Sequence, residues 1–264
     1  MKLSAFGQKF AGDSGIVGLM DDLGSALDHN PEMIMMGGGN PGRLPAMEEV
    51  FQQQLDRVLQ DAQQRHRLFG RYQSPQGDLD FRRCVAEFLA SELGWKLDAA
   101  NIAIANGSQS AFFTLFNLFA GDMPDGSRRT VHLPLTPEYL GYADSGLSEL
   151  FFSATRPDIE LLEQDLFKYR VDFPRLELDE QAGAMCVSRP TNPTGNVLTD
   201  GEIAHLDQLA HERDIPLIID GAYGLPFPNI LFTEARPHWN ENTVLVLSLS
   251  KLGLPGVRTG IVVA

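Results

Sequence analysis

The stretch Thr243-Val-Leu-Val-Leu-Ser-Leu-Ser-Lys-Leu-Gly-Leu-Pro-Gly-Val-Arg-Thr-Gly260 begins with a mostly apolar run and ends in a glycine-rich segment. The run over 243–249 is typical of a buried strand, and Lys251 stands just beyond its end. A solvated lysine is common at the end of a strand. This stretch alone is therefore equally consistent with a surface cation and with a functional amine.

The rest of the sequence places this strand in a larger sheet. From residue 101 onward, short apolar runs alternate with segments of helical periodicity. This alternation predicts an α/β fold, a mostly parallel sheet with helices on both faces. The predicted strands cover 102–105, 130–133, 184–187, 216–219 and 243–249, and the predicted helices between them cover 108–119 and 200–213.

The region before residue 101 is predicted to be mainly helical. Helices are expected over 13–27, 46–61 and 78–93, and a short strand is expected to begin at Met33 and to run into a loop rich in glycine and proline. Residues 1–45 are predicted to form an N-terminal segment outside the core, and residues 46–264 a large domain.

Composition excludes several classes of partner. A chain of 264 residues with 43% hydrophobic content can bury a substantial core, and its net charge of −14 disfavours nucleic acids and anionic membranes as partners. The two cysteines, Cys84 and Cys186, have no metal-ligand spacing, so neither a metal site nor a disulfide is expected. No run has the length of a signal peptide or a membrane span, and we expect a cytoplasmic protein.

Polar or aromatic groups follow each predicted strand. Ligands bind at the carboxyl ends of the strands in parallel sheets, so we expect these groups to converge on one pocket. The segments concerned are 106–110, 134–139, 188–195, 220–223 and 250–251.

Several of these groups are suited to binding a phosphate. Gly107, Ser108 and Gln109 open a helix, where backbone N–H groups and the helix dipole favour an anion. Ser248, Ser250 and Arg258 could add hydroxyl donors and a guanidinium. Taken singly, Ser108 is more often an ordinary helix cap and the others surface residues.

A lysine beside a phosphate site suggests pyridoxal phosphate, whose aldehyde condenses with an amine and whose ring then acts as an electron sink. Asp220 could keep the ring nitrogen protonated, and Asn192 and Tyr223 could bond the ring oxygen. Tyr139 could stack on the ring. The alternative is that Asp220 and Asn192 are turn residues and that Tyr139 packs in the core.

Six stretches together carry a family resemblance. The chain resembles the fold-type I, pyridoxal-phosphate-dependent aminotransferases, and its opening residues and Phe116-Asn-Leu-Phe-Ala-Gly121 are similar to the branch that uses valine and pyruvate. The stretches are Gly37-Gly-Gly-Asn-Pro41, Tyr72-Gln-Ser-Pro-Gln-Gly77, Asn106-Gly-Ser-Gln-Ser-Ala-Phe-Phe113, Ser188-Arg-Pro-Thr-Asn-Pro-Thr-Gly195, Asp220-Gly-Ala-Tyr-Gly224 and Ser248-Leu-Ser-Lys-Leu-Gly-Leu-Pro-Gly256.

The resemblance implies transfer of the amino group of valine to pyruvate, with specific roles for the site residues. Lys251 would bind the cofactor as a Schiff base and carry the proton, and Asp220 and Tyr223 would assist it. Gly39 would offer its N–H near the substrate carboxylate, and Tyr72 would reach the phosphate in the neighbouring subunit of a homodimer. The other implied cofactor contacts are Ser108, Gln109, Tyr139, Asn192, Ser248, Ser250 and Arg258.

The chain departs from the family pattern in two places. Gly221 stands where relatives tend to have a polar residue, and the family normally continues past Ala264 into a small domain that carries the arginine for the substrate carboxylate. We therefore expect a truncated chain that is inactive by itself.

Three alternatives remain at this stage. They are another pyridoxal phosphate enzyme of this fold (another aminotransferase, a C–S lyase or a cyclopropane amino acid synthase), a non-catalytic sensor domain, and, least favoured, a dinucleotide-binding dehydrogenase. The last lacks a Gly-x-Gly-x-x-Gly motif after a strand.

Overall fold

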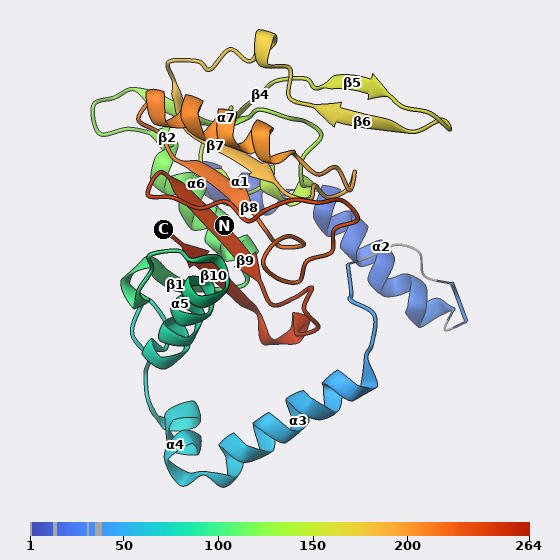
Figure 1. Cartoon of the computed structure of the whole chain (residues 1–264), viewed down its shortest axis with the longest axis vertical. Helices are drawn as coiled ribbons and strands as arrows, with labels where there is room; N and C mark the ends of the chain where they lie inside the picture. The colour runs from blue at the N-terminus through green and yellow to red at the C-terminus, as the bar shows by residue number, and fades with distance from the viewer. Residues whose placement is uncertain (1, 13–14, 31, 35–38) are drawn as a thin grey trace.

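A sheet of eight strands forms the centre of the computed structural model, which describes residues 2–12, 15–30, 32–34 and 39–264 (Figure 1). The strand order is β1-β10-β9-β8-β7-β3-β2, and β4 also pairs with β3. The strands are β1 Ile102–Asn106, β2 Gly121–Asp122, β3 Arg128–Leu133, β4 Phe152–Ala154, β7 Ala182–Ser188, β8 Leu217–Asp220, β9 Thr243–Ser248 and β10 Thr259–Val263.

The prediction of a mostly parallel sheet is confirmed. Strands β4, β3, β7, β8 and β9 pair in parallel, each with the next. Strand β10 is antiparallel to both β9 and β1, so β1 runs in the same direction as β9. The carboxyl ends of β1, β3, β7, β8 and β9 therefore lie at the same edge of the sheet.

Helices cover both faces, and the alternation of side chains along each strand explains how. On β7, Ala184 and Cys186 face helix α6 (Ser108–Phe119), whereas Met185 and Val187 face the opposite side. Helices α5 (Leu79–Leu93) and α7 (Asp200–Glu212) pack their buried apolar residues on that opposite side, together with Met185 and Val187. Both sides of the central strands are apolar because both are covered.

Local signals in the sequence fix where the covering helices begin. Thr199 and Glu202 form a capping box at α7, and the Asp78 side chain accepts from the Phe81 N–H at the start of α5. Gly94 ends α5 with a left-handed φ of 71°. The predicted helices over 78–93, 108–119 and 200–213 are all found to within one residue.

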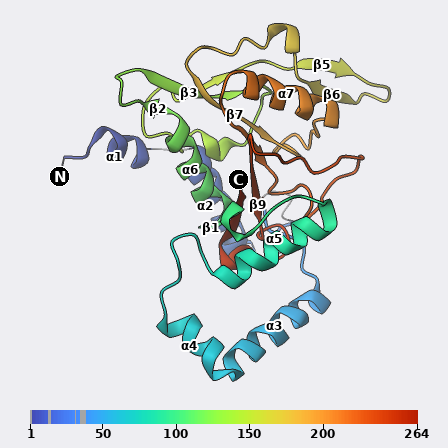
Figure 2. The ribbon, with the colours of Figure 1, turned by 60° about the vertical axis from the view of Figure 1, so that its left-hand side comes forward.

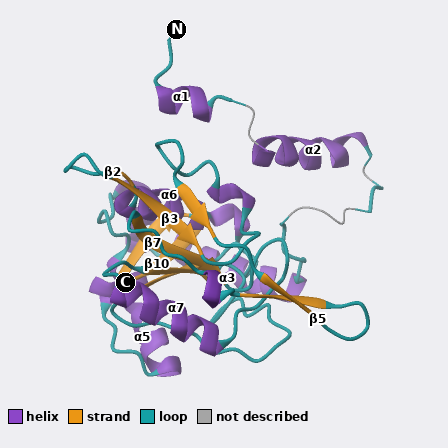
Figure 3. Ribbon diagram, turned by 90° about the horizontal axis from the view of Figure 1, so that it is seen from above, coloured by secondary structure: helices purple, strands orange, loops and turns teal. Residues whose placement is uncertain are grey.

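Four further helices lie outside the sheet. Helices α1 (Ala5–Phe10) and α2 (Gly15–His29) lie beside the body (Figure 3). The ring centroids of Phe6 in α1 and Phe113 in α6 are 6.3 Å apart. Helices α3 (Pro45–Gln60) and α4 (Ala62–Gly70) extend away from the sheet and bury none of their residues (Figures 1 and 2).

The remaining elements are short. A hairpin of β5 (Asp158–Leu161) and β6 (Phe167–Arg170) forms a separate two-stranded sheet. The 3-10 turns are Ala99–Asn101, Leu140–Tyr142, Phe173–Arg175 and Pro255–Val257. Across the described parts of the chain, no helix combines the length and the apolar character that crossing a membrane requires.

Some expectations for the N-terminal region need correction. Met33 and Ile34 were predicted to begin a strand, but they belong to none. Residues 35–36 of that predicted strand and Asp13 of the first predicted helix lie outside the described residues. That helix runs over Gly15–His29 instead of 13–27. The elements not predicted were α1, α4, β2, β4, β5, β6 and β10.

The core beneath α6 offers a test of the fold. Phe116 is fully buried and its ring packs against those of Phe112 and Tyr142, whereas Leu118 in the same helix is 65% exposed. Phe116→Ala should lower the free energy of unfolding in urea by about 3–5 kcal/mol, because it leaves a cavity. The control Leu118→Ala should change it by less than about 0.5 kcal/mol. Equal effects of the two variants would contradict this placement of α6.

Candidate active site

The ends of five strands bring the predicted site residues to one edge of the sheet. The turn after β1 carries Gly107, and the loops after β3 and β7 carry Tyr139 and Asn192. Asp220 ends β8, and Lys251 follows β9. The site is thus assembled from residues far apart in the sequence, as the parallel strand ends predicted.

Lys251 is a half-buried amine that points toward two other site residues. Its Nζ donates to the carbonyl oxygen of Gly39 and lies 5.2 Å from the centroid of the Tyr223 ring. Burial, and to a lesser degree the positive charge of Arg258, lowers the pKa of Lys251. A lower pKa raises the fraction of neutral amine, which is the nucleophilic form.

Asp220 is a buried carboxyl group held by two donors. The Tyr142 hydroxyl donates to Oδ2 at 2.6 Å, and the Ala222 N–H donates to Oδ1 at 2.8 Å. Burial raises the pKa of Asp220, and no salt bridge to it occurs within the described part of the chain. A carboxylate in this position would be stabilised by a cationic ligand.

Arg258 and the start of α6 form a cradle for an anion. The guanidinium lies directly over Gly107, where a Cβ atom would be 2.5 Å from Nη2, and the φ of 84° at this position favours glycine. Its Nη1 makes two long hydrogen bonds, of 3.4 Å, to Ser250 Oγ and the Pro255 carbonyl. Since these contacts leave most of its donors available, Arg258 can bind an anion beside the helix terminus.

Ser108 does not cap its own helix. Gly107, with a φ of 84°, is the N-cap of α6, and no side chain caps this end of the helix. The alternative of an ordinary serine cap is therefore wrong. The leading N–H groups of α6 lack intrahelical partners, as at the start of any α-helix.

Two other predicted phosphate residues have side chains that position their neighbours. Gln109 Nε2 donates to the Gly141 carbonyl at 2.8 Å, which ties α6 to the loop with Tyr139. Ser248 is buried, and its Oγ accepts from the Ser250 N–H at 3.1 Å. Gln109 is thus left with its backbone N–H for a ligand.

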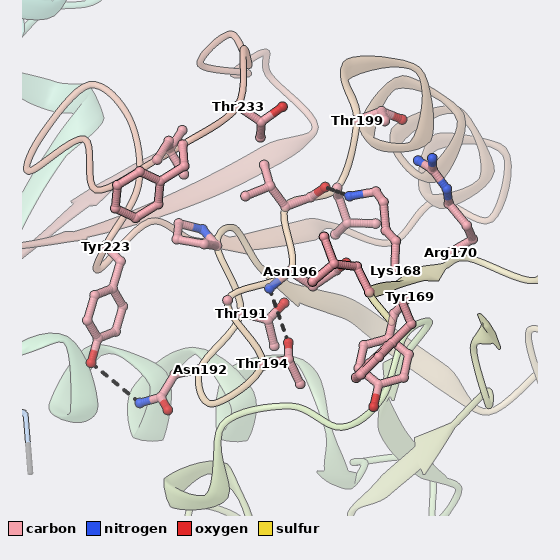
Figure 4. Close-up of a pocket in the computed structure, with 18 of the residues that line it drawn as sticks. Lys168, Tyr169, Arg170, Thr191, Asn192, Thr194, Asn196, Thr199, Tyr223 and Thr233 are labelled. Atoms are coloured by element: carbon pink, nitrogen blue, oxygen red, sulfur yellow. Dashed lines mark hydrogen bonds between the residues drawn. The ribbon is translucent and has the colours of Figure 1, made fainter. Parts of the chain in front are cut away.

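The polar groups of Asn192 and Tyr223 lie close together (Figure 4). Asn192 Nδ2 donates to the Tyr223 hydroxyl over 3.4 Å, a long hydrogen bond. Burial is the main cause of the raised pKa of Tyr223. The Tyr139 ring packs edge-on against Tyr142, with centroids 5.4 Å apart.

A pocket of about 880 Å³ lies beside these residues. Asn192 and Tyr223 line it, together with Lys168 and Tyr169 of β6 and the loop with Phe232 (Figure 4). Its volume is in the range of small-molecule sites. Neither Lys251 nor Asp220 lines it, so the pocket adjoins the reactive groups and does not contain them.

Two residues of the site were not predicted from the sequence. Glu138 was missed although it lies in the segment 134–139 that had been singled out, and Tyr142 lies three residues beyond that segment. Tyr72, which was predicted to reach the phosphate of a neighbouring subunit, is fully exposed in this chain. Gly221 packs so tightly that a Cβ atom would lie 2.9 Å from the Leu247 side chain.

Comparison with known proteins gives a consistent result. Residues 37–264 match the family described as aminotransferase class I and II. The whole chain is 53% identical to the valine–pyruvate aminotransferase of Escherichia coli, of which it covers 63%. The chain thus spans somewhat less than two thirds of that relative.

Solved structures agree in fold. One, described as an amino-acid aminotransferase of Psychrobacter arcticum, superposes on the whole chain with a TM-score of 0.93 at 47% identity, and the chain covers 64% of it. The valine–pyruvate aminotransferase of Salmonella typhimurium matches 95% of the chain with a TM-score of 0.82 at 50% identity, and 60% of that protein is covered. On this evidence, the chain belongs to the aminotransferase class I and II family.

Proposed function

We propose that this chain is the cofactor-binding part of a pyridoxal-phosphate-dependent transaminase that moves the amino group of valine to pyruvate. The observation that carries the cofactor assignment is the meeting of Lys251, Asp220 and Arg258 at one edge of the sheet. The substrate assignment is supported by the 53% identity to a valine–pyruvate aminotransferase.

The residues present fit pyridoxal phosphate. Arg258 over Gly107 offers a cation and free N–H groups to the phosphate. The buried carboxyl of Asp220, without a cationic partner among the described residues, suits a protonated ring nitrogen. When bound, the cofactor supplies an electron sink for the negative charge that develops at the α-carbon of the amino acid.

The residues of the chain would then have distinct tasks. Lys251 Nζ, with its lowered pKa, would act as the nucleophile and move a proton at the substrate α-carbon. Asp220 would hold the proton of the ring nitrogen, and Tyr142 would hold Asp220 in place through its 2.6 Å hydrogen bond. Tyr223 and Asn192 would orient the ring oxygen, and Tyr139 would lie against the ring.

The family likeness also supports a proposal for the wider assembly. Residues 46–264 would form the large domain and residues 1–45 an N-terminal segment, and the part of the relatives that the chain does not cover would supply a small domain. Gly39, whose carbonyl meets Lys251, would lie near the substrate carboxylate. The exposed Tyr72 and the exposed apolar side chains of α3 and α4 would meet a second subunit.

The amine of Lys251 is tested by trapping. Borohydride reduction of the chain with bound pyridoxal phosphate, followed by peptide mapping, should place the label on Lys251. The pKa of Lys251 lies below the usual 10.5, so the rate at which its amine reacts with pyridoxal phosphate should reach half its maximum at a pH below that value. Lys251→Arg should abolish labelling, whereas Lys168→Arg, at another lysine with a pKa lowered by burial, should not. A label on Lys168 would overturn the assignment.

Asp220→Asn tests the contact with the ring nitrogen. Loss of a charge-assisted hydrogen bond of about 1.5–3 kcal/mol should weaken pyridoxal phosphate binding roughly 10- to 100-fold in a fluorescence titration. The control Asp158→Asn changes an exposed carboxyl on β5 and should leave the affinity unchanged. Unchanged affinity in a folded Asp220→Asn chain, as judged by circular dichroism, would show that Asp220 has no such role.

The substrate proposal is tested with valine and pyruvate. A polypeptide lengthened by the part of the Escherichia coli relative that this chain does not cover should produce alanine. The 264-residue chain should be slower by about 100-fold or more, since substrate orientation would be lost. Equal rates would mean that a residue within this chain grips the substrate carboxylate. No alanine from the lengthened protein would argue against valine as the donor.

A further inference from the structure

Glu138 is a carboxyl group at the candidate site that none of the roles above uses. It follows the turn after β3 and directly precedes Tyr139. Its Oε1 accepts from the Ser188 N–H at 2.9 Å, and its Oε2 forms a short hydrogen bond with Ser188 Oγ. Oε2 also accepts from the Tyr139 N–H over 3.3 Å, so the carboxyl group joins the loop after β3 to the end of β7.

Ser188 connects this carboxyl to the residues that would contact the cofactor. It is buried, and it pairs in register with Asp220 on β8. Its carbonyl accepts from Thr191 Oγ1 at 3.1 Å, in the loop that carries Asn192. Glu138 thus links the loop with Tyr139 and Tyr142 to the strand ends that carry Asp220 and Asn192.

The electrostatic surroundings of Glu138 are negative or neutral. Burial, and to a lesser degree the charge of Asp220, raises the pKa of Glu138 to about 7. The other titratable groups that interact with it are the Tyr142 hydroxyl and the Cys186 thiol on β7, and burial raises the pKa of both. No salt bridge to Glu138 is present in the described ranges.

We propose that Glu138 is a positioning residue for the transaminase site: through Ser188 it fixes the loop that holds Tyr139 and Tyr142, and in its ionised form it strengthens the hold of Asp220 on the proton of the ring nitrogen. The inference rests on the proposed function, because the ring belongs to the proposed cofactor. A merely structural tie between two strand ends would account for the first part and not for the second.

The structural tie through Ser188 and the electrostatic effect of the charge can be separated by two variants of Glu138. Glu138→Gln keeps a carbonyl oxygen for the Ser188 N–H and an NH2 donor for Ser188 Oγ, but it removes the charge and the acceptor of the long bond from the Tyr139 N–H. Without that negative charge nearby, cationic groups on the bound cofactor lose their protons more easily. Glu138→Ala removes the tie as well and leaves the buried Ser188 N–H without its acceptor.

The test is a pH titration of the absorbance of pyridoxal phosphate bound to each chain. In Glu138→Gln the midpoint should move to lower pH by about half a unit, a roughly threefold loss of proton affinity, while the dissociation constant stays within about twofold. In Glu138→Ala the dissociation constant should rise about tenfold. The control Glu149→Gln, at an exposed carboxyl outside the site, should match the unaltered chain in both measurements.

The outcomes separate this inference from the proposed function. If the unaltered chain binds pyridoxal phosphate and Glu138→Gln has an unchanged midpoint, Glu138 has no electrostatic role and the inference fails alone. If the unaltered chain does not bind pyridoxal phosphate, the proposed function fails and the inference fails with it. Should Glu138→Ala not fold, the midpoint in Glu138→Gln still decides.

Discussion

The geometry of the candidate site depends on the close contact between β10 and the turn into α6. A Cβ atom on Gly260 would lie 2.6 Å from both the Gly107 carbonyl carbon and the Ser108 nitrogen, so only glycine allows the two backbones to approach this closely. Arg258 stands two residues earlier, with a left-handed φ of 53°, and its guanidinium reaches over Gly107. The antiparallel pairing of β10 with β9 then holds this cation near Lys251. The backbone from β9 to β10 therefore positions both the amine of Lys251 and the guanidinium of Arg258.

The parts of the fold that follow from local rules could be predicted from the sequence. Helix α6 was predicted over 108–119 and has these bounds, because Gly107 precedes it and its apolar residues repeat with helical spacing. Strands β8 and β9 were predicted to within one residue, since central strands of a parallel sheet are apolar on both faces. The site residues at the strand ends followed from the common direction of those strands.

Other features depend on contacts that the sequence does not display. Strand β10 (Thr259–Val263) is short and mostly apolar, and such a stretch carries no information about its direction in the sheet. Helix α4 has no apolar stripe, since most of its residues are glutamine, arginine or histidine. Tyr142 bonds Asp220, which is 78 residues away in the sequence, and Glu138 bonds Ser188, which is 50 residues away. Buried polar pairs of this kind become visible only when the strands are assembled.

The pairing of β1 with β10 has a consequence for how the chain folds during synthesis. These strands join Ile102 to Val263, and beside them Asn101 bonds Ala264 across 163 positions of sequence. At about 5–20 residues per second, a ribosome needs roughly 10–30 s to make that interval. Throughout this time β1 presents hydrogen-bonding groups whose partner strand does not yet exist, and unpaired strand edges attract other chains. Assembly of the site therefore cannot be completed until β10 has been synthesised and the sheet can close.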